Sequence, residues 1–343
     1  MFDPRQVFAA VASAIRNPDI RRVEMAWGAA IAAEWAHFVA FGVFAYEEGG
    51  VSAVGIAGLV RLLPAAVVAP FAASLGDRFP RARFLLAMPL VGAVALGGSA
   101  VAFAVDAEHL VFAFAALLGL SITLIRPALQ ALLPSLARTP RELIAANGAT
   151  STIESLGTLV GPLIAGVLVS VADAGLVFAL GSGVLLLASL VLSRVRVEGR
   201  VELLADAEAG AGQALAAGFR TIMRAPRARL LIGMIIAQTF IRGCLNVLIV
   251  VAAFDVLDAG AEAVGYMTAA IGVGGLVGAI GAMALGGRRL AFVFGLALVF
   301  WGVPIVLMGP LPDLVVAVVL LAVVGAANSV EDVAVFTLLQ RLV

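Results

Sequence analysis

The sequence has no lysine, little charge of either sign and few of the residues on which enzymes depend. Only 13 % of its 343 residues are charged, all 22 basic residues are arginines, and there are two histidines and one cysteine. A single cysteine excludes an intrachain disulfide framework, and Cys244 lies in an apolar stretch, where we expect it to pack rather than to react. No P-loop, HExxH motif or Cys/His cluster is present, so we expect no enzyme, no ATP-driven pump, no bound metal and no cofactor.

Long apolar stretches make up most of the chain. Hydrophobic residues account for 63 % of it and the mean hydropathy is +1.12, too apolar to build a water-soluble surface. A helix needs about 20 residues to cross the bilayer, and the stretches have that length. The sequence therefore predicts an all-α membrane protein with ten spans, at residues 23–46, 52–75, 84–105, 109–135, 143–171, 174–193, 229–254, 263–286, 290–309 and 313–340.

The charged residues alternate between the predicted loops by sign. Nineteen arginines fall in the N-terminal arm, in alternate loops or at the C-terminal end, and the remaining three lie inside spans. The other loops hold only acids, namely Glu47, Glu48, Asp106, Glu108, Asp173, Asp255, Asp258, Glu262 and Asp313. Because arginine-rich loops stay in the cytoplasm, this pattern predicts a multi-pass protein of a bacterial-type inner (plasma) membrane with a cytoplasmic N-terminus.

An internal repeat divides the chain into two halves. The segment AIRNPDIRRV at 14–23 matches IMRAPRARLL at 222–231, an offset of 208, and three shorter matches follow at an offset of 210. We expect two bundles of equal orientation, as in parallel transporter repeats. Residues 1–193 form a six-helix bundle with a short amphipathic N-terminal arm, and residues 229–343 form four helices. Two helices are then missing, and we expect a fragment of a twelve-helix protein; a natural ten-helix protein is the alternative.

Two local patterns predict how helices lie. In the linker 194–228, apolar residues recur at helical spacing beside arginines, which favours an amphipathic helix on the cytoplasmic membrane surface over a flexible linker. In the eighth span, Gly274 and Gly278 have small-xxx-small spacing. We expect another backbone to approach that helix closely.

The loop ASLGDRFPRAR at 73–83 resembles a motif of the major facilitator superfamily (MFS), G-x-x-x-D-R-x-G-R-[RK]. Asp77, Arg78 and Arg81 match it, while alanine or proline replaces its two glycines and its last base. The resemblance implies that these three residues act in the switch between inward-open and outward-open states. The alternative is that the arginines only fix the topology.

The fifth span carries a second motif. GTLVGPLIAG at 157–166 resembles the G-x-x-x-G-P-x-x-G-G pattern of proton-coupled antiporters in the same superfamily, and only Ala165 departs from it. Gly157 and Gly161 permit close helix contact and Pro162 favours a kink, so the resemblance implies that all three take part in gating. A packing helix rich in glycine is the alternative. With the repeat and the basic central loop, the chain looks like an MFS transporter, most similar to the multidrug-efflux and siderophore-exporter branches.

Seven ionisable residues lie well inside the predicted spans: Glu34, Arg61, Arg126, Glu154, Arg242, Glu331 and Asp332. Each costs about 2.5 to 3.5 kcal/mol at mid-bilayer on insertion scales, so they should face a bundle interior and find partners there. A carboxylate that moves between a dry site and an arginine can bind and release a proton. Glu34 and Glu154 are our candidates for proton coupling, and the resemblance adds Arg126. A static network of ion pairs is the alternative.

Polar residues at helical spacing extend this site. Asn147, Ser151 and Glu154 share one helix face, Gln238, Arg242 and Asn246 share another, and His37 lies one turn from Glu34. We expect a cavity lined by Arg61, His37, Asn147, Ser151, Gln238, Arg242 and Asn246, although a lone histidine such as His37 is more often a packing residue.

These features predict a secondary active transporter that exports a small amphipathic molecule in exchange for protons by alternating access. A facilitator or importer of the same fold, and a non-transporting membrane scaffold or sensor, are the alternatives. The expected partners are the substrate, protons and the lipid bilayer; the arginines serve topology, so we expect no nucleic acid, and we expect a monomer.

Overall fold

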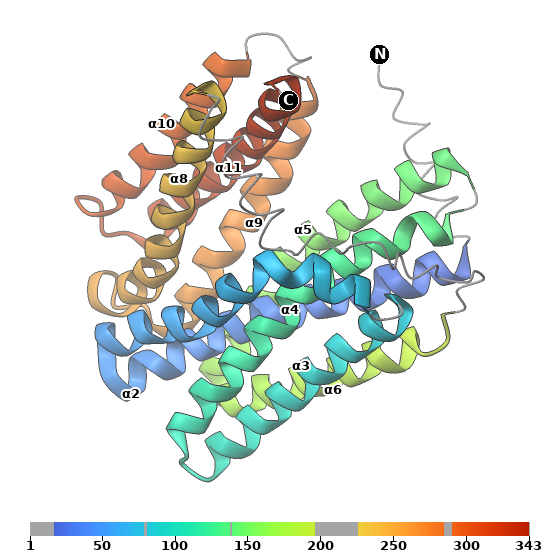
Figure 1. Cartoon of the computed structure of the whole chain (residues 1–343). Coiled ribbons are helices and arrows are strands. Elements are labelled where there is room, and N and C mark those ends of the chain that lie inside the picture. The colour runs from blue at the N-terminus through green and yellow to red at the C-terminus, as the bar shows by residue number, and fades with distance from the viewer. Residues whose placement is uncertain (1–16, 79–80, 138, 196–225, 285–289, 343) are drawn as a thin grey trace. The chain divides into compact units, whose positions relative to one another are not determined.

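The computed structural model of the chain describes residues 17–78, 81–137, 139–195, 226–284 and 290–342, and these residues form helices joined by short turns (Figure 1). Eight helical segments are long and apolar enough to cross a membrane, and Phe292–Met308 is a shorter apolar helix. One of the eight, Pro18–Val68, contains the first predicted span and most of the second, so each of the ten predicted spans coincides with a helix of the described residues. The predicted N-terminal arm and the linker helix lie outside the described residues.

The described residues of the first half form five helical elements. They are α2 (Pro18–Arg78), α3 (Arg81–Ala104), α4 (Glu108–Leu136), α5 (Pro140–Val171) and α6 (Ala174–Leu192). The helical path of α2 breaks at Gly49 and Gly50, where Gly50 has φ +61°, a value that glycine adopts without steric cost. The break lies between the first two predicted spans, so α2 consists of two arms joined by a tight turn.

In the second half, the part of the chain that the structure describes forms a further five elements. They are α8 (Pro226–Val251), the π-helix η1 (Ala252–Val256), α9 (Gly260–Ala284), α10 (Leu290–Met308) and α11 (Leu314–Leu342). Two acids of the predicted acidic loops cap helices: Asp173 accepts a hydrogen bond from the Leu176 amide at 2.8 Å, and Asp313 accepts one from the Val316 amide at 3.0 Å. Carboxylates at these positions satisfy amide groups that the first turn of a helix leaves unpaired.

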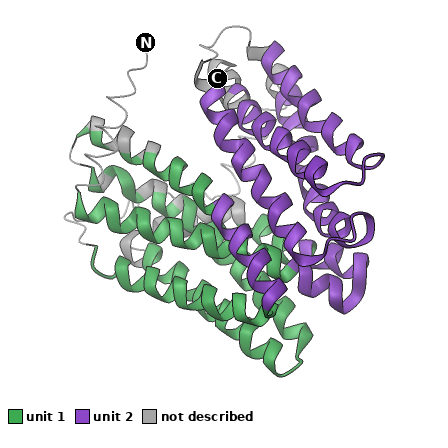
Figure 2. Cartoon of the chain, turned by 180° about the vertical axis from the view of Figure 1, so that it is seen from behind, with its two compact units in different colours: residues 1–41, 59–157, 172–211 green, residues 42–58, 158–171, 212–343 purple. Residues whose placement is uncertain are grey.

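The helices form two compact units, coloured separately in Figure 2. Unit 1 contains residues 1–41, 59–157 and 172–211, and unit 2 contains residues 42–58, 158–171 and 212–343. The turn of α2 and the second part of α5 thus group with the second half of the chain. Proximity in one conformation does not define the sequence domains, so the predicted division at 193 and 229 stays a prediction.

Within unit 1, α3 lies along both α4 and α6. Small residues set these approaches: a side chain at Gly98 would collide with the Phe114 ring, and one at Gly97 would lie 3.0 Å from the Ser182 hydroxyl. At the same level the fully buried Phe178 of α6 contacts His37 of α2, with ring centroids 5.4 Å apart. Unit 1 therefore has a tightly filled interior between α2, α3 and α6.

Within unit 2, α9 and α11 lie backbone to backbone. A side chain at Gly274 or Gly278 would overlap the backbone of Ala322 or Ala326, and one at Gly325 would overlap the backbone of Ile271. The close approach predicted from Gly274 and Gly278 is confirmed.

The second part of α5 meets α9 in the same way, again in unit 2. A Cβ at Gly166 would lie 2.9 Å from the Cα of Gly265, and a Cβ at Gly265 would lie 2.7 Å from the carbonyl oxygen of Pro162. The glycine motif of α5 therefore serves as a contact surface for another helix.

We call the helix ends that carry the acidic loops the acidic-loop end, and the opposite ends the arginine-loop end. In unit 2 the turn of α2 is fastened to α8 and η1 at the acidic-loop end. The Tyr46 hydroxyl donates a hydrogen bond to Asp255, and its ring stacks on Phe254 with centroids 4.4 Å apart. A Cβ at Gly42 would lie only 3.0 Å from Val250. A polar bond and an apolar contact thus hold this end of unit 2 together.

Candidate functional site

The first ion pair of unit 1 joins the two arms of α2. Arg61 donates to the Glu34 carboxylate at 2.9 Å, and both side chains are largely shielded from solvent, with 12 % and 23 % of their surface exposed. The Arg61 guanidinium also lies over the Phe38 ring, 5.3 Å from its centroid. Gly119 of α4 allows this arrangement because any side chain there would overlap the Arg61 backbone carbonyl. The reversal of the chain at Gly50 brings the two charges together.

The second ion pair of unit 1 joins α4 to α5. Arg126 lies 3.2 Å from a Glu154 oxygen. The Arg126 side chain is 58 % exposed, whereas Glu154 is 27 % exposed, so this pair is the more open of the two. An exposed arginine in the middle of apolar helices is costly unless it faces water.

The two pairs belong to one cluster. Glu34 is close enough to both Arg126 and Glu154 to interact with their charges. Reciprocal contacts between α2 and α5 hold the cluster: Ile153 fits against Gly28, and Ile31 fits against Gly157, each methyl group 2.7 Å from where a Cβ would be. Two bases and two acids, contributed by α2, α4 and α5, thus gather inside unit 1.

A third carboxylate, Glu24, lies at the same α2–α5 interface toward the arginine-loop end. It is only 4 % exposed, and its Oε1 accepts a hydrogen bond from the Thr150 hydroxyl at 2.5 Å. Sequence reasoning missed Glu24 because it adjoins Arg21 and Arg22 at the edge of the first predicted span, where an acid looks like a loop residue. Its seven-residue spacing from Ile31 would have placed it on the face that meets α5.

Unit 2 contains a polar network between α8 and α11. Asn328 accepts hydrogen bonds from Arg242 and, at 3.0 Å, from Gln238, and it donates one to Asp332 at 3.2 Å. Glu331 is 2 % exposed, and one of its oxygens has no hydrogen-bond partner among the described residues. Gln238 and Arg242, which the sequence predicted to share a helix face, thus belong to one network. They are connected by Asn328, which sequence reasoning missed. Its position one turn before Asp332 was the available signal.

The remaining predicted site residues are scattered. His37 is buried between Phe41 and Phe178, and neither ring nitrogen has a hydrogen-bond partner among the described residues. Asn246 is half-buried on α8, and Gly157, Gly161 and Pro162 are buried on α5. Asp77 and Arg78 end α2, Arg81 begins α3, and Asn147 and Ser151 lie in α5. The side chains of these last five residues lie outside the described part of the structure.

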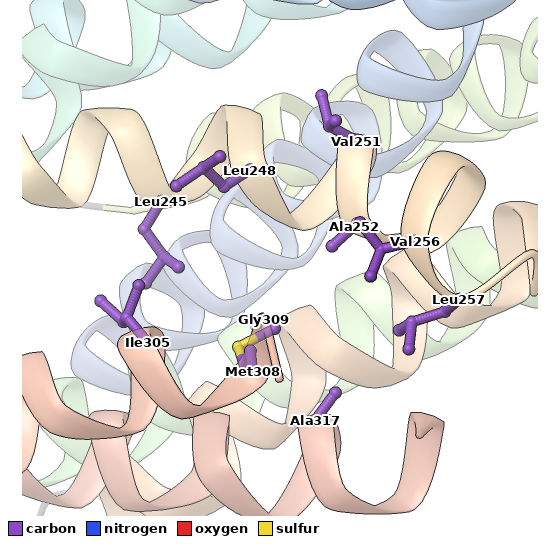
Figure 3. Close-up of a pocket in the computed structure, with 10 residues that line it drawn as sticks. All are labelled: Leu245, Leu248, Val251, Ala252, Val256, Leu257, Ile305, Met308, Gly309 and Ala317. Atoms are coloured by element: carbon purple, nitrogen blue, oxygen red, sulfur yellow. The ribbon is translucent and has the colours of Figure 1, made fainter. Parts of the chain in front are cut away.

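Unit 2 also contains an apolar pocket of about 200 Å³ near its acidic-loop end (Figure 3). It is formed by α8, η1, α10 and the start of α11, and its lining consists of Leu245, Leu248, Val251, Ala252, Val256, Leu257, Ile305, Met308, Gly309 and Ala317. None of these residues is charged. The pocket is therefore chemically distinct from the charged cluster of unit 1 and from the polar network of unit 2.

Three solved structures share the fold at low sequence identity. The crystal structure of a D-xylose–proton symporter matches with a TM-score of 0.71 at 14 % identity, covering 94 % of this chain and 82 % of the symporter. A bacterial homologue of the human lysosomal transporter Spinster, inward-facing and unoccupied, matches with a TM-score of 0.56 at 14 % identity, covering 98 % and 75 %. The inward-facing, occupied form of that homologue gives 0.55 at 13 % identity, covering 94 % and 77 %. At these identities the likeness shows the fold alone.

Sequence comparison places the chain in a family. No curated protein matches it. The family model described as Major Facilitator Superfamily matches residues 26–343, nearly the whole chain. This match agrees with the membrane-spanning helices and with the fold shared with the symporter. The chain therefore belongs to the major facilitator superfamily, and it is a membrane transporter rather than an enzyme.

Proposed function

We propose that this protein exports a small amphipathic molecule in exchange for protons, by alternating access between two states. The observation that carries the proposal is the charged cluster of unit 1, in which Glu34–Arg61 and Arg126–Glu154 lie close enough to interact. Each carboxylate can exist as an ion paired with its arginine or as a neutral acid, and the two forms favour different surroundings. Protonation of either acid releases an arginine, which couples proton binding to helix position.

Two contacts of unit 2 are the ones that we expect to break and re-form during transport. Alternating access requires that the Tyr46–Asp255 bond and the contact between Gly166 and Gly265 form in one state and separate in the other. The α5 residues in the second contact belong to the segment that resembles the antiporter motif. This resemblance supports export and the gating role of Gly157, Gly161 and Pro162, and we assign Asp77, Arg78 and Arg81 to the gate at the opposite end.

The loop charges support the orientation and the location of the protein. Arginines occupy one set of loops and acids the other, so we assign the arginine-loop end and the N-terminus to the cytoplasm of a bacterial-type cell. The multidrug-efflux and siderophore-exporter branches fit this reading, and we expect a monomer without a cofactor.

An importer is the second candidate. The D-xylose–proton symporter shares the fold at a TM-score of 0.71, and its name describes a sugar moving together with protons. The same charged cluster serves either direction because proton binding and release do not depend on which side the substrate enters. The two candidates differ in one measurable sign: antiport moves protons against the flow of substrate, and symport moves them with it.

The test uses the full chain in proteoliposomes with a pH-sensitive dye trapped inside. A panel of fluorescent amphipathic dyes and D-xylose are offered one at a time, with and without an imposed pH gradient. We expect dye movement opposed to proton movement. Glu34→Gln and Glu154→Gln should each abolish the proton signal. Glu108→Gln, the same change at an exposed acid of the acidic-loop end, should leave it intact.

Undiminished proton-coupled transport in both Glu34→Gln and Glu154→Gln would reject the coupling scheme. Uptake of D-xylose together with protons would replace export by import. Movement of substrate that persists after the gradient is collapsed, without any proton signal, would identify a facilitator.

A further inference from the structure

We infer that Glu24 is a further proton-binding site, in series with the charged cluster and between that cluster and the arginine-loop end. The inference rests on the proposed proton coupling and extends it to a residue at the α2–α5 interface. Glu24 would take the proton that Glu154 gives up, become a neutral acid, and return to a carboxylate when the proton leaves at the arginine-loop end. One proton moves in each step, and no other reactant is needed.

The first support is the environment of the Glu24 carboxyl group. The residue is 4 % exposed, and its Oε2 has no hydrogen-bond partner among the described residues. No charged side chain in the described part of the chain lies near enough to neutralise it. On its own helix, Arg21 is exposed and Arg22 bonds to Asp19. A buried carboxylate with no base beside it is costly as an ion, so this site suits the neutral acid.

The second support is the hydrogen-bond count at Thr150. Its hydroxyl lies 2.5 Å from Glu24 Oε1 and 3.0 Å from the backbone oxygen of Ala146. A hydroxyl has one proton, so it can donate to only one of these two oxygens. If Glu24 carries a proton, its O–H donates to Thr150 and the threonine hydroxyl donates to Ala146, and both bonds form at once. Both bonds of the Thr150 hydroxyl can therefore form together only with a proton on Glu24.

The third support is position. Thr150 lies one helical turn before Glu154 on α5, about 6 Å along the axis and on the same face. Glu24 lies ten residues before Glu34 on α2, and the interlocked pairs Gly28–Ile153 and Ile31–Gly157 fill the interface between them. The polar groups Glu154, Thr150 and Glu24 therefore follow one another along a single interface toward the arginine-loop end. This order is what a proton path leaving the cluster requires.

Infrared difference spectroscopy of the full chain in lipid nanodiscs tests proton binding without any substrate. We expect wild type near neutral pH to show the carbonyl stretch of a protonated carboxyl group that Glu24→Gln loses. Thr150→Val replaces the hydroxyl by a methyl group and should shift that band. This second variant tests the inference even if Glu24→Gln does not fold. The control Glu108→Gln should not change the band. Identical spectra for wild type, Glu24→Gln and Thr150→Val over the whole pH range would overturn the inference.

A transport measurement separates this inference from the proposed function. In proteoliposomes, Glu24→Gln should slow proton-driven transport by about a hundredfold, within the range for a positioned proton-transfer group, and should leave substrate exchange without a gradient unchanged. If Glu24→Gln transports normally while Glu34→Gln and Glu154→Gln fail, the role in series is wrong and the proposed function stands. If Glu24→Gln loses the infrared band but no variant alters proton coupling, Glu24 binds a proton and the proposed coupling fails.

Discussion

The two halves of the chain place charge inside the membrane in different ways. In unit 1 each intramembrane arginine is bonded to a carboxylate, Arg61 to Glu34 and Arg126 to Glu154. In unit 2 Arg242 donates a hydrogen bond to the amide oxygen of Asn328, which is neutral. The amide nitrogen of Asn328 in turn donates a hydrogen bond to Asp332. Protonation breaks a carboxylate–arginine pair, whereas an amide does not titrate. In unit 1 the intramembrane arginines are thus paired with groups that can titrate, whereas in unit 2 an amide connects Arg242 of α8 to α11.

The predicted internal repeat bears on this difference. If the offset of 208 extends to Glu34 of α2, this residue corresponds to Arg242 of α8, and the two positions carry opposite charges. Two acids inside the spans of unit 2, Glu331 and Asp332, lie instead on α11.

The largest expected effect comes from removing the arginine of a carboxylate pair. Arg61→Gln leaves Glu34 without its base, and breaking one side of a buried pair costs about 3 to 5 kcal/mol, with this partly shielded pair toward the lower end. Arg242→Gln removes a bond to an amide and should cost less, about 1.5 to 3 kcal/mol. Unfolding in mixed micelles with SDS measures both. Equal losses would show that the two halves do not differ as we describe.

A double variant measures the interaction free energy of the Glu34–Arg61 pair separately from the effect of each single substitution. Glu34→Gln combined with Arg61→Gln leaves no unpaired charge and should recover part of the stability lost in Arg61→Gln alone. Loss of stability that is simply additive would show that the ion pair contributes nothing beyond its two side chains.

The next effect compares one helix contact from each unit. In unit 2 a Cβ at Gly278 would overlap the backbone of Ala326, while in unit 1 a Cβ at Gly28 would meet the γ2 methyl group of Ile153, at 2.7 Å. A side chain can turn away and a helix backbone cannot. Gly278→Ala should therefore cost about 1 to 3 kcal/mol and Gly28→Ala clearly less, in the same unfolding assay. The reverse order would place the tighter helix contact in unit 1.

Sequence reasoning predicted the spans and many of the polar residues, but not their partners. Length and apolar composition are enough to predict membrane helices, and an acid such as Glu154 inside an apolar run is visible at once. Its bond to Arg126 is not visible, because the two residues lie on different helices and meet only in the folded bundle. Thr150 and Asn328 were missed as partners for the same reason. Asn246 belongs to a predicted polar stripe, and its part in any site stays a prediction.

A smaller effect tests the fastening at the acidic-loop end of unit 2. Tyr46→Phe removes the bond to Asp255 and keeps the stacking on Phe254, so it should weaken this contact only slightly. Spin labels at the exposed positions Glu47 and Asp258, in a Cys244→Ser background, measure the distance across this end. We expect a larger population of longer distances in Tyr46→Phe. An unchanged distribution would show that apolar contact alone holds this end of unit 2.

The smallest expected effect concerns the apolar pocket. No charged side chain of the described residues lines it, so we expect it to be an apolar packing surface rather than part of the proton-coupled path. Two of its residues, Leu248 and Val256, are 48 % and 49 % exposed in a membrane-spanning segment, so lipid chains can reach it.

Ala252→Leu places a larger side chain in the pocket. Lipid hydrocarbon is as apolar as leucine, so the exchange of one for the other carries little free energy, and stability should change by less than about 0.5 kcal/mol. Proton-coupled transport in proteoliposomes should equal that of wild type. Loss of transport with normal stability would contradict this interpretation, because it would place the pocket on the substrate path and give unit 2 a direct part in recognition.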